Sequence, residues 1–276
     1  MEPIDARKIW RTLEPYHGFI YFAPEAVEEY AALGVTGRSG YFMSRSAPMG
    51  AATAEVVIAT FYNFNPGLVR HAMADGWSVA SPADMVAARV RAVDRALRRM
   101  LGDDVVESAE VAEAAALAGE AAEGCTAPGR PLYAGHASLA WPDEPHLALW
   151  HAVSLLREFR GDGHIAALVA DGIGPLTALV LHGGEGQVPM AALQATRAWP
   201  DDEWQAEVAA LRARGWLGDD DLLTPAGAAA RQHVEDVTDV LALAPWDHLG
   251  PDGHARLREL GRTLSKAVFA AGALSP

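Results

Sequence analysis

The segment from Leu211 to Gly227, "LRARGWLGDDDLLTPAG", constrains the fold more than any other part of this chain. A helix that ends in Arg-Gly is followed by a short connection, and Leu-Thr-Pro-Ala-Gly then supplies the threonine cap and early proline that open a new helix. The pattern predicts a helix over 201–214, a wing over 216–223 and a long helix over 224–243.

Helical periodicity extends well beyond this segment. Further helices are predicted over 84–101, 105–123, 146–160, 164–171, 175–181, 189–196 and 252–271. Gly161 and Gly163 are expected to kink or interrupt the chain between 160 and 164. The stretch 124–145 is rich in glycine and proline, which is typical of a linker. We therefore predict a mainly α-helical chain with one domain over 1–140 and a second over 141–276.

Residues 146–276 resemble a MarR-type winged helix, and "LRARGWL" and "LTPAG" carry that resemblance. In that family the long flanking helices form a dimer, and small ligands often bind where the dimerisation and DNA-reading parts meet. The whole chain also resembles an uncharacterised actinobacterial helix-turn-helix family, through "YHGFIYFAPEA", "AEVVIATFYNFNP", "LLREFRGDGHIAALV" and "VEDVTDVLALAPWDHLG". The second resemblance brings no established reaction.

The first half of the chain contains weaker echoes of the second half. "APMGAATAE" at 47–55 is similar to "VPMAALQAT" at 188–196, and "LRRMLGDDVVESAEVAEAA" at 97–115 is similar to "LRARGWLGDDDLLTPAGAAA" at 211–230. The offsets are 141 and 116 residues, so the first copy would carry 25 extra residues, near 56–80. Either the chain is a fused pseudo-dimer with a degenerate first winged helix, or alanine-rich sequence produces the echoes by chance and a homodimer is expected.

The charge of the chain argues against DNA binding. The net charge is −14, and residues 201–239 contain ten acidic residues and three arginines. Affinity for DNA depends largely on cations that neutralise phosphates. The arginine face of 84–101 is expected to be solvated or paired with glutamates of 105–123; it comprises Arg89, Arg91, Arg95, Arg98 and Arg99. A winged helix that no longer binds DNA is favoured, and a MarR-type ligand-responsive transcriptional regulator is the alternative.

Several classes of protein are excluded or disfavoured by what the sequence lacks. Cys125 is the single cysteine, so no internal disulfide or multi-cysteine metal site can form. No P-loop, Gly-x-Gly-x-x-Gly fingerprint or His-Glu-x-x-His motif occurs, so a nucleotide cofactor is not expected and any metal is unknown. Neither a signal peptide nor an apolar run of about 18 residues is present. We expect a cytoplasmic protein with no membrane segment.

Two aromatic segments supply candidate ligand-binding or cofactor-binding residues. In "YHGFIYF", His17 and Tyr21 lie among aromatic side chains, where the imidazole could be an axial haem ligand, a general base or an anchor for a flat organic ligand. The alternative is a core histidine bonded to a backbone carbonyl. In "FYNFNPGLVRH", Tyr62, Asn65 and His71 either line a cavity or cap the break that Pro66 makes.

The segment "WHAVSLLREFRGDGH" holds the densest group of candidate catalytic residues, namely His151, Arg157, Glu158 and His164. An arginine there could bind a carboxylate ligand, and a histidine could serve as acid and base. The alternative is a structural ion-pair network. We predict a small aromatic or carboxylate ligand, or a haem-like cofactor, held between the two halves. Binding alone and catalysis in secondary metabolism both remain open.

Overall fold

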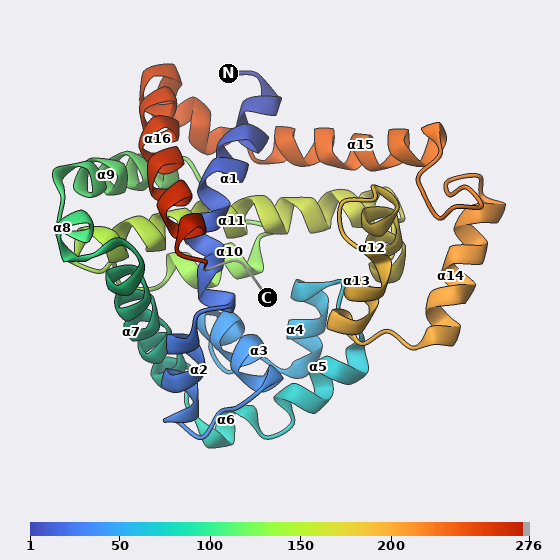
Figure 1. Ribbon diagram of the computed structural model, residues 1–276, viewed down its shortest axis with the longest axis horizontal. Helices are drawn as coiled ribbons and strands as arrows, with labels where there is room; N and C mark the ends of the chain where they lie inside the picture. The colour runs from blue at the N-terminus through green and yellow to red at the C-terminus, as the bar shows by residue number, and fades with distance from the viewer. Residues whose placement is uncertain (273–276) are drawn as a thin grey trace. The chain divides into compact units, whose positions relative to one another are not determined.

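The computed structural model describes residues 1–272, and nearly all of its regular structure is helical (Figure 1). Among these residues, the only β pairing is a single antiparallel bridge between Leu217 and Leu223. The prediction of a mainly α-helical chain is confirmed. The chain forms two compact units: unit 1 comprises residues 1–52, 75–162 and the described residues from 239 onward, and unit 2 comprises residues 53–74 and 163–238.

Unit 1 is a bundle in which α16 packs against both α1 and α9, while α7 packs against α2 and α3 (Figure 1). α1 and α16 approach each other closely at Gly261, where an added Cβ would lie 2.5 Å from Leu13 Cδ2. The elements of unit 1 are α1 (Pro3–Gly18), η1 (Phe19–Tyr21), α2 (Pro24–Ala31), α3 (Arg38–Ser46), η2 (Ala47–Met49), α6 (Gly76–Val79), α7 (Pro82–Leu101), α8 (Asp103–Val106), α9 (Ala109–Glu123), α10 (Pro131–Ala137), the first part of α11 (Pro145–Ala170) and α16 (Ala244–Ala270).

Unit 2 is built around α12, which packs against both α13 and α14. Its elements are α4 (Ala54–Phe61), α5 (Pro66–Met73), the end of α11, α12 (Pro175–Gly184), α13 (Met190–Arg197), α14 (Asp201–Ala213) and most of α15 (Pro225–Leu241). Leu179, Leu193 and Trp204 are among the buried side chains of these helices. α14, the bridged connection and α15 follow one another in the order that the sequence predicts.

The predicted helix starts at Thr224 and Asp201 are confirmed. Thr224 Oγ1 accepts a hydrogen bond of 3.2 Å from the backbone N–H of Gly227, which caps α15. α14 begins at Asp201, directly after Pro200. The predicted helix over 84–101 is α7, which opens at Ser81 with a reciprocal capping box to Asp84. Caps are local interactions, so the sequence alone carries the information for them.

The predicted kink at Gly161 and Gly163 is wrong, because α11 is one continuous helix of 26 residues. A glycine inside a helix costs about 1 kcal/mol relative to alanine. The turns on either side bury Phe159, Ala167 and Leu168. Burial of these side chains outweighs the weak helix propensity of the two glycines.

Three other boundaries also differ from the prediction. The helix expected over 105–123 is split into α8 and α9, because Ser108 Oγ accepts from Val111 N and starts a new helix. The predicted linker over 124–145 contains α10. The last helix begins at Ala244 rather than near 252, and Gly250, with φ of 76°, breaks its helical geometry just before Pro251. Each difference follows from a cap or turn that the helical periodicity does not encode.

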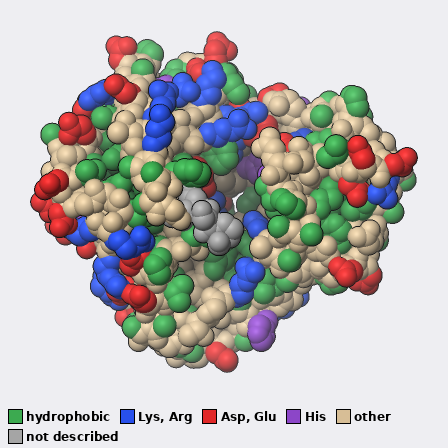
Figure 2. Space-filling view, viewed as in Figure 1, with side chains coloured by type: hydrophobic (Ala, Val, Ile, Leu, Met, Phe, Trp, Pro, Cys, Tyr) green, Lys and Arg blue, Asp and Glu red, His purple; other side chains and the backbone are tan. Residues whose placement is uncertain are grey.

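Apart from Arg89, the arginine face of α7 is paired, but chiefly with α2 rather than with α9. Arg91 and Arg95 contact Glu29 at 2.8 and 2.9 Å, and Arg99 pairs with Glu25. Only Arg98 reaches toward the expected partner segment, at Glu107. In Figure 2 arginine and acidic side chains lie next to one another over this region, at the lower left. Because α2 packs on α7, its glutamates neutralise a face that could otherwise attract phosphates.

The two segments behind the suggested duplication each form a helix, a short connection and a second helix. In one copy these are the end of α7, then α8 and α9; in the other they are α14, the bridge and α15. The two compact units each combine separate stretches of sequence, whereas the sequence predicts consecutive domains that meet near residue 140. The duplication and that division stay predictions.

Within residues 1–272, no single helix is both long and apolar enough to cross a membrane. α11 and α12 would reach that length and composition together, but they are bent by 103° at the break between them.

Candidate functional site

Unit 1 contains a cavity of about 180 Å³ between α7, α10 and the start of α11. Its lining is largely apolar and includes Val86, Val90, Leu139, Leu147 and Trp150. An apolar cavity of about 150 Å³ is known to hold a benzene molecule. The volume therefore suits one aromatic ring with a small substituent. Polar residues also line it, namely Ser44, Arg89, His136 and His151.

Arg89 is a buried cation that has no acidic partner among residues 1–272. The residue is 3% exposed, and it donates from Nη1 to the backbone oxygen of Ser44 at 3.1 Å. Its guanidinium lies 5.0 Å from the ring centre of Trp150, and Nε finds no hydrogen-bond partner in the described chain. Buried charges are normally paired. An uncompensated guanidinium at a cavity is therefore suited to an anion.

His136 presents a nitrogen that can only accept a hydrogen bond. Its Nδ1 lies 2.9 Å from the backbone oxygen of Leu132, and a carbonyl accepts only, so Nδ1 carries the proton. Burial lowers the pKa of His136 to about 4, so the imidazole is neutral at physiological pH and Nε2 is a bare lone pair. The residue is 2% exposed, and Nε2 has no hydrogen-bond partner among residues 1–272.

His151 also lines the cavity. It is 5% exposed, and burial lowers its pKa to about 4. Its ring meets Trp141 edge to face at a centroid distance of 4.8 Å, and its Nε2 has no hydrogen-bond partner in the described part of the chain. Trp141 itself is 47% exposed in the connection between α10 and α11. Of the predicted catalytic residues, His151 is the one that lines this cavity.

A chain of hydrogen bonds connects Arg89 through Tyr21 and His17 to Ser154, and the donor of each bond can be assigned. Ser154 Oγ donates to the backbone oxygen of Trp150 at 2.8 Å, so it must accept from His17 Nδ1 at 3.0 Å. His17 Nε2 then accepts from the hydroxyl of Tyr21 at 3.0 Å, and the Tyr21 oxygen accepts from Arg89 Nη2 at 3.4 Å. Burial, together with Arg157 and Arg89, lowers the pKa of His17 well below its ordinary value. His17 and Tyr21 therefore position Arg89.

Neither His17 nor the cavity of unit 1 fits a haem. Both imidazole nitrogens of His17 are engaged, to Ser154 and Tyr21, so neither can bond to an iron. The cavity has room for about one aromatic ring rather than for a porphyrin. In addition, no group of three or more His, Cys, Asp or Glu side chains among residues 1–272 is placed to hold a metal ion.

Glu158 and Arg157, which the sequence suggests as catalytic, belong to a buried ion cluster. Glu158 is fully buried and accepts from Arg157 Nη1 at 2.9 and 3.0 Å and from Arg45 Nη2 at 3.2 Å. Burial alone would raise the pKa of Glu158, but Arg157 and Arg45 hold it well below its ordinary value. This arrangement matches the alternative of a structural ion-pair network.

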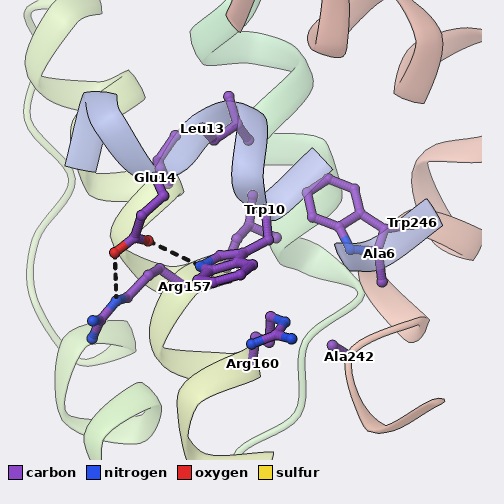
Figure 3. Close-up of a pocket in the computed structure, with 10 residues that line it drawn as sticks. Ala6, Trp10, Leu13, Glu14, Arg157, Arg160, Ala242 and Trp246 are labelled. Carbon is purple, nitrogen blue, oxygen red and sulfur yellow. Dashed lines mark hydrogen bonds and ion pairs between the residues drawn. The ribbon is translucent and has the colours of Figure 1, made fainter. Parts of the chain in front are cut away.

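Glu14 fixes the outer end of this cluster (Figure 3). One carboxylate oxygen accepts from Trp10 Nε1 at 2.9 Å, and the other lies 3.7 Å from Arg157 Nε. The adjoining cavity has a volume of about 10 Å³, which is space for roughly one water molecule. This second cavity is too small for an organic ligand, and it is therefore not the candidate site.

The remaining predicted site residues lie in unit 2. Asn65 Oδ1 accepts from Gly67 N at 2.8 Å and caps α5, which is the capping role considered from the sequence. Tyr62, with φ of 58°, donates its hydroxyl proton to the backbone oxygen of Ile173. His71 is exposed, and His164 Nδ1 lies 2.9 Å from Thr238 Oγ1. These side chains are not brought to the cavity of unit 1.

Arg89 and His136 are site residues that the sequence patterns do not identify. Arg89 belongs to the arginine face that is expected to be solvated or paired, yet it follows Met85 by four residues and precedes Val93 by four, and both of these are buried. That helical spacing is a signal that could have identified Arg89 as a core cation. His136 lies in the stretch taken as a linker, and nothing in its local sequence indicates burial.

Asp162 holds the first turn of α10, the helix that carries His136. Its Oδ2 accepts from Tyr133 N at 2.9 Å, and burial raises its pKa to about 6. Because the folded pKa lies above the unfolded one, the protein loses stability as pH rises from about 4 to about 6. We expect Asp162→Asn to raise the free energy of unfolding at pH 7.5 by up to about 3 kcal/mol and to have little effect near pH 4. Urea titrations at both pH values, with the exposed Asp143→Asn as the control, test this; equal effects at both pH values would contradict it.

Comparison with known proteins places the whole chain in one class. A model described as a helix-turn-helix family matches residues 6–275, which covers both units. No curated protein matches the chain, and no solved structure does.

Proposed function

We propose that this chain, which belongs to a helix-turn-helix family, is a ligand-binding protein that holds a small aromatic carboxylate in the cavity of unit 1 and does not bind DNA. The observation that carries this proposal is the buried guanidinium of Arg89, which lines an apolar cavity and has no acidic partner among residues 1–272.

A carboxylate supplies what Arg89 lacks. It would neutralise the buried charge and accept charge-assisted hydrogen bonds from the guanidinium. The apolar side chains and the indole of Trp150 offer surfaces for one flat ring. The hydrogen bond from Arg89 to Tyr21 and the stack of His17 on Trp150, with planes 5° apart, hold the guanidinium and the indole in place before the ligand arrives.

The two cavity histidines support binding rather than turnover. With pKa values of about 4, both imidazoles are neutral and weakly basic at physiological pH. An efficient general base has a pKa near the working pH. We assign His136 and His151 to hydrogen bonding with the ligand.

The charges of α14 and its connection to α15 support the absence of DNA binding. In a MarR-like winged helix, α14 would be the recognition helix and the bridged connection would be the wing. The exposed first turn of α14 consists of Asp201, Asp202 and Glu203. At its other end, Arg212 pairs with Asp221 at 2.6 Å, and Arg214 stacks 3.4 Å above the ring of Trp216. The cations nearest to a bound duplex would therefore already be engaged.

Calorimetric titration with benzoate tests the binding site. We expect saturable one-to-one binding to the wild-type protein and roughly 10–100-fold weaker binding to Arg89→Gln, because a charge-assisted hydrogen bond is lost. Arg91→Gln, on the same helix but exposed and paired with Glu29, is the matched control and should bind benzoate normally. Absence of saturable binding, or equal binding by Arg89→Gln, would overturn the proposal.

A second variant separates loss of the site from loss of folding. Ala140 lines the cavity from an exposed position in the connection between α10 and α11, so Ala140→Phe should fill the cavity and leave the packed helices intact. We expect it to keep the circular dichroism of the wild type and to lose benzoate binding. Unchanged affinity in this variant would place the benzoate elsewhere.

Gel shifts with duplexes from upstream of the gene test the other half of the proposal. We expect no sequence-specific complex at physiological salt. A specific, salt-sensitive complex that Arg212→Ala or Arg214→Ala weakens would instead establish the ligand-responsive transcriptional regulator.

A further inference from the structure

We infer that the ligand carries, in addition to its carboxylate, a ring N–H or O–H group that donates a hydrogen bond to Nε2 of His136. This inference rests on the proposed function, because it assigns a second contact to a ligand already held by Arg89. It identifies His136 as the residue that distinguishes aromatic acids with a second polar group from those without one.

The hydrogen bond to Leu132 determines what His136 can do. Because Nδ1 donates to that carbonyl at 2.9 Å, a neutral His136 has no second proton, and Nε2 can only accept. Nδ1 also holds the ring in one orientation on α10. A buried acceptor in apolar surroundings loses its hydrogen bonds to water, so it favours a partner that brings a donor.

The neighbouring side chains of the cavity do not supply that donor. The two Nη groups of Arg89 donate to Ser44 and Tyr21, and neither Arg89 nor His151 forms a hydrogen bond with His136 within residues 1–272. No group of three or more ligating side chains among those residues is placed to hold a metal ion at Nε2. A ligand in the cavity that His136 lines would supply the N–H or O–H group that the described side chains do not.

A sulfonate or phosphate with no second group would satisfy Arg89 and leave His136 unpartnered. A site built to hydrogen-bond a ligand group discriminates against analogues that lack it, because the protein group is then buried without a partner. The ligand class is consequently a monocyclic aromatic acid with a hydroxyl or amino substituent on its ring.

The first experiment compares benzoate with 3-hydroxybenzoate, 4-hydroxybenzoate and the two corresponding methoxybenzoates on the wild-type protein. We expect one hydroxybenzoate to bind about 10–100-fold more tightly than benzoate, and its methoxy analogue to lose that gain because it has no proton to donate. Equal affinities for benzoate and both hydroxybenzoates would overturn the inference. If benzoate then still required Arg89, the proposed function would stand without it.

The second experiment assigns the preference to His136. His136→Phe should still bind benzoate, and its affinities for the hydroxybenzoate and for benzoate should differ by no more than about threefold. His233→Phe, an exposed histidine of unit 2, is the control and should keep the preference. Retention of the full preference in His136→Phe would overturn the assignment.

Nitrogen-15 spectra of the wild-type histidines provide a readout that does not depend on a variant folding. The Nε2 resonance of His136 should have the position of an unprotonated imidazole nitrogen and should shift toward the hydrogen-bonded range with the hydroxybenzoate but not with benzoate. The same shift with both compounds, or with neither, would contradict a ligand donor at His136. No binding of any aromatic acid would remove the proposed function together with this inference.

Discussion

Replacing Glu158 with glutamine is expected to lower the free energy of unfolding by about 3–5 kcal/mol. Glutamine keeps the shape of the side chain and removes its charge. Arg45 and Arg157, which lie 3.2 and 2.9 Å from the carboxylate, would then be two like charges held together in the interior. Breaking a buried ion cluster at its central member leaves uncompensated charges, and this costs more than the cluster contributes relative to apolar side chains.

Urea unfolding followed by circular dichroism measures this effect. Glu113→Gln is the matched control, since Glu113 pairs with Arg256 at 2.8 Å on the surface, where water and salt screen the interaction. We expect the free energy of unfolding of the control to be close to that of the wild type. A Glu158→Gln variant that is as stable as the control would show that the cluster is more hydrated than its burial indicates.

Replacing Trp150 with alanine is expected to lower the free energy of unfolding by about 3–5 kcal/mol, as is typical when a large buried aromatic side chain is removed. Trp150 is buried in unit 1, where it contacts both His17 and Arg89. Its ring stacks on His17 at 5.7 Å and lies 5.0 Å from the guanidinium of Arg89, and its indole N–H donates to the backbone oxygen of His17 at 3.3 Å. The variant loses these contacts and also enlarges the cavity.

Thermal and urea unfolding of Trp150→Ala and Trp141→Ala provide the comparison. Both indoles lie close to the cavity, but Trp141 is half exposed and contacts chiefly His151 and the surface of α9 at Gly119. We expect Trp141→Ala to have a much smaller effect on stability. Similar losses in the two variants would argue that the indole of Trp150 is not a central part of the core.

The partners of charged residues were harder to predict from the sequence than the helices were, as Arg157 and Glu158 illustrate. Arg157 and Glu158 are adjacent in sequence, and their pairing with each other could be considered in advance. Their third partner, Arg45, lies 113 residues away and reaches Glu158 only because α3 packs in the same unit. Together with Glu14, which lies 3.7 Å from Arg157, the cluster holds two arginines and two carboxylates, so its charges balance within the protein.

Arg89 illustrates the opposite outcome. Arg91, Arg95 and Arg99 on the same helix all find glutamates of α2, while Arg89 faces the interior and finds none among the described residues. A shift of two residues along the helix separates a surface ion pair from an unpaired core cation. Local spacing indicates that Arg89 is buried. It does not indicate whether another segment of the chain places an acidic side chain next to Arg89.

The sequence by itself determined that this protein is helical and, to within about two residues, where α7, α11, α12, α13, α14 and α15 begin, because periodicity and caps such as Thr224 act over a few residues. The helices of residues 1–81 and α10 were not predicted. It also excluded disulfides and argued against DNA binding through charge. The tertiary structure alone decided the continuity of α11 and the partners of the α7 arginines. It also decided that Arg89 has no acidic partner and that Nε2 of His136 has no hydrogen-bond partner among the described residues. These depend on which helix faces meet, and contacts between residues far apart in the chain set the burial and pairing of each polar group.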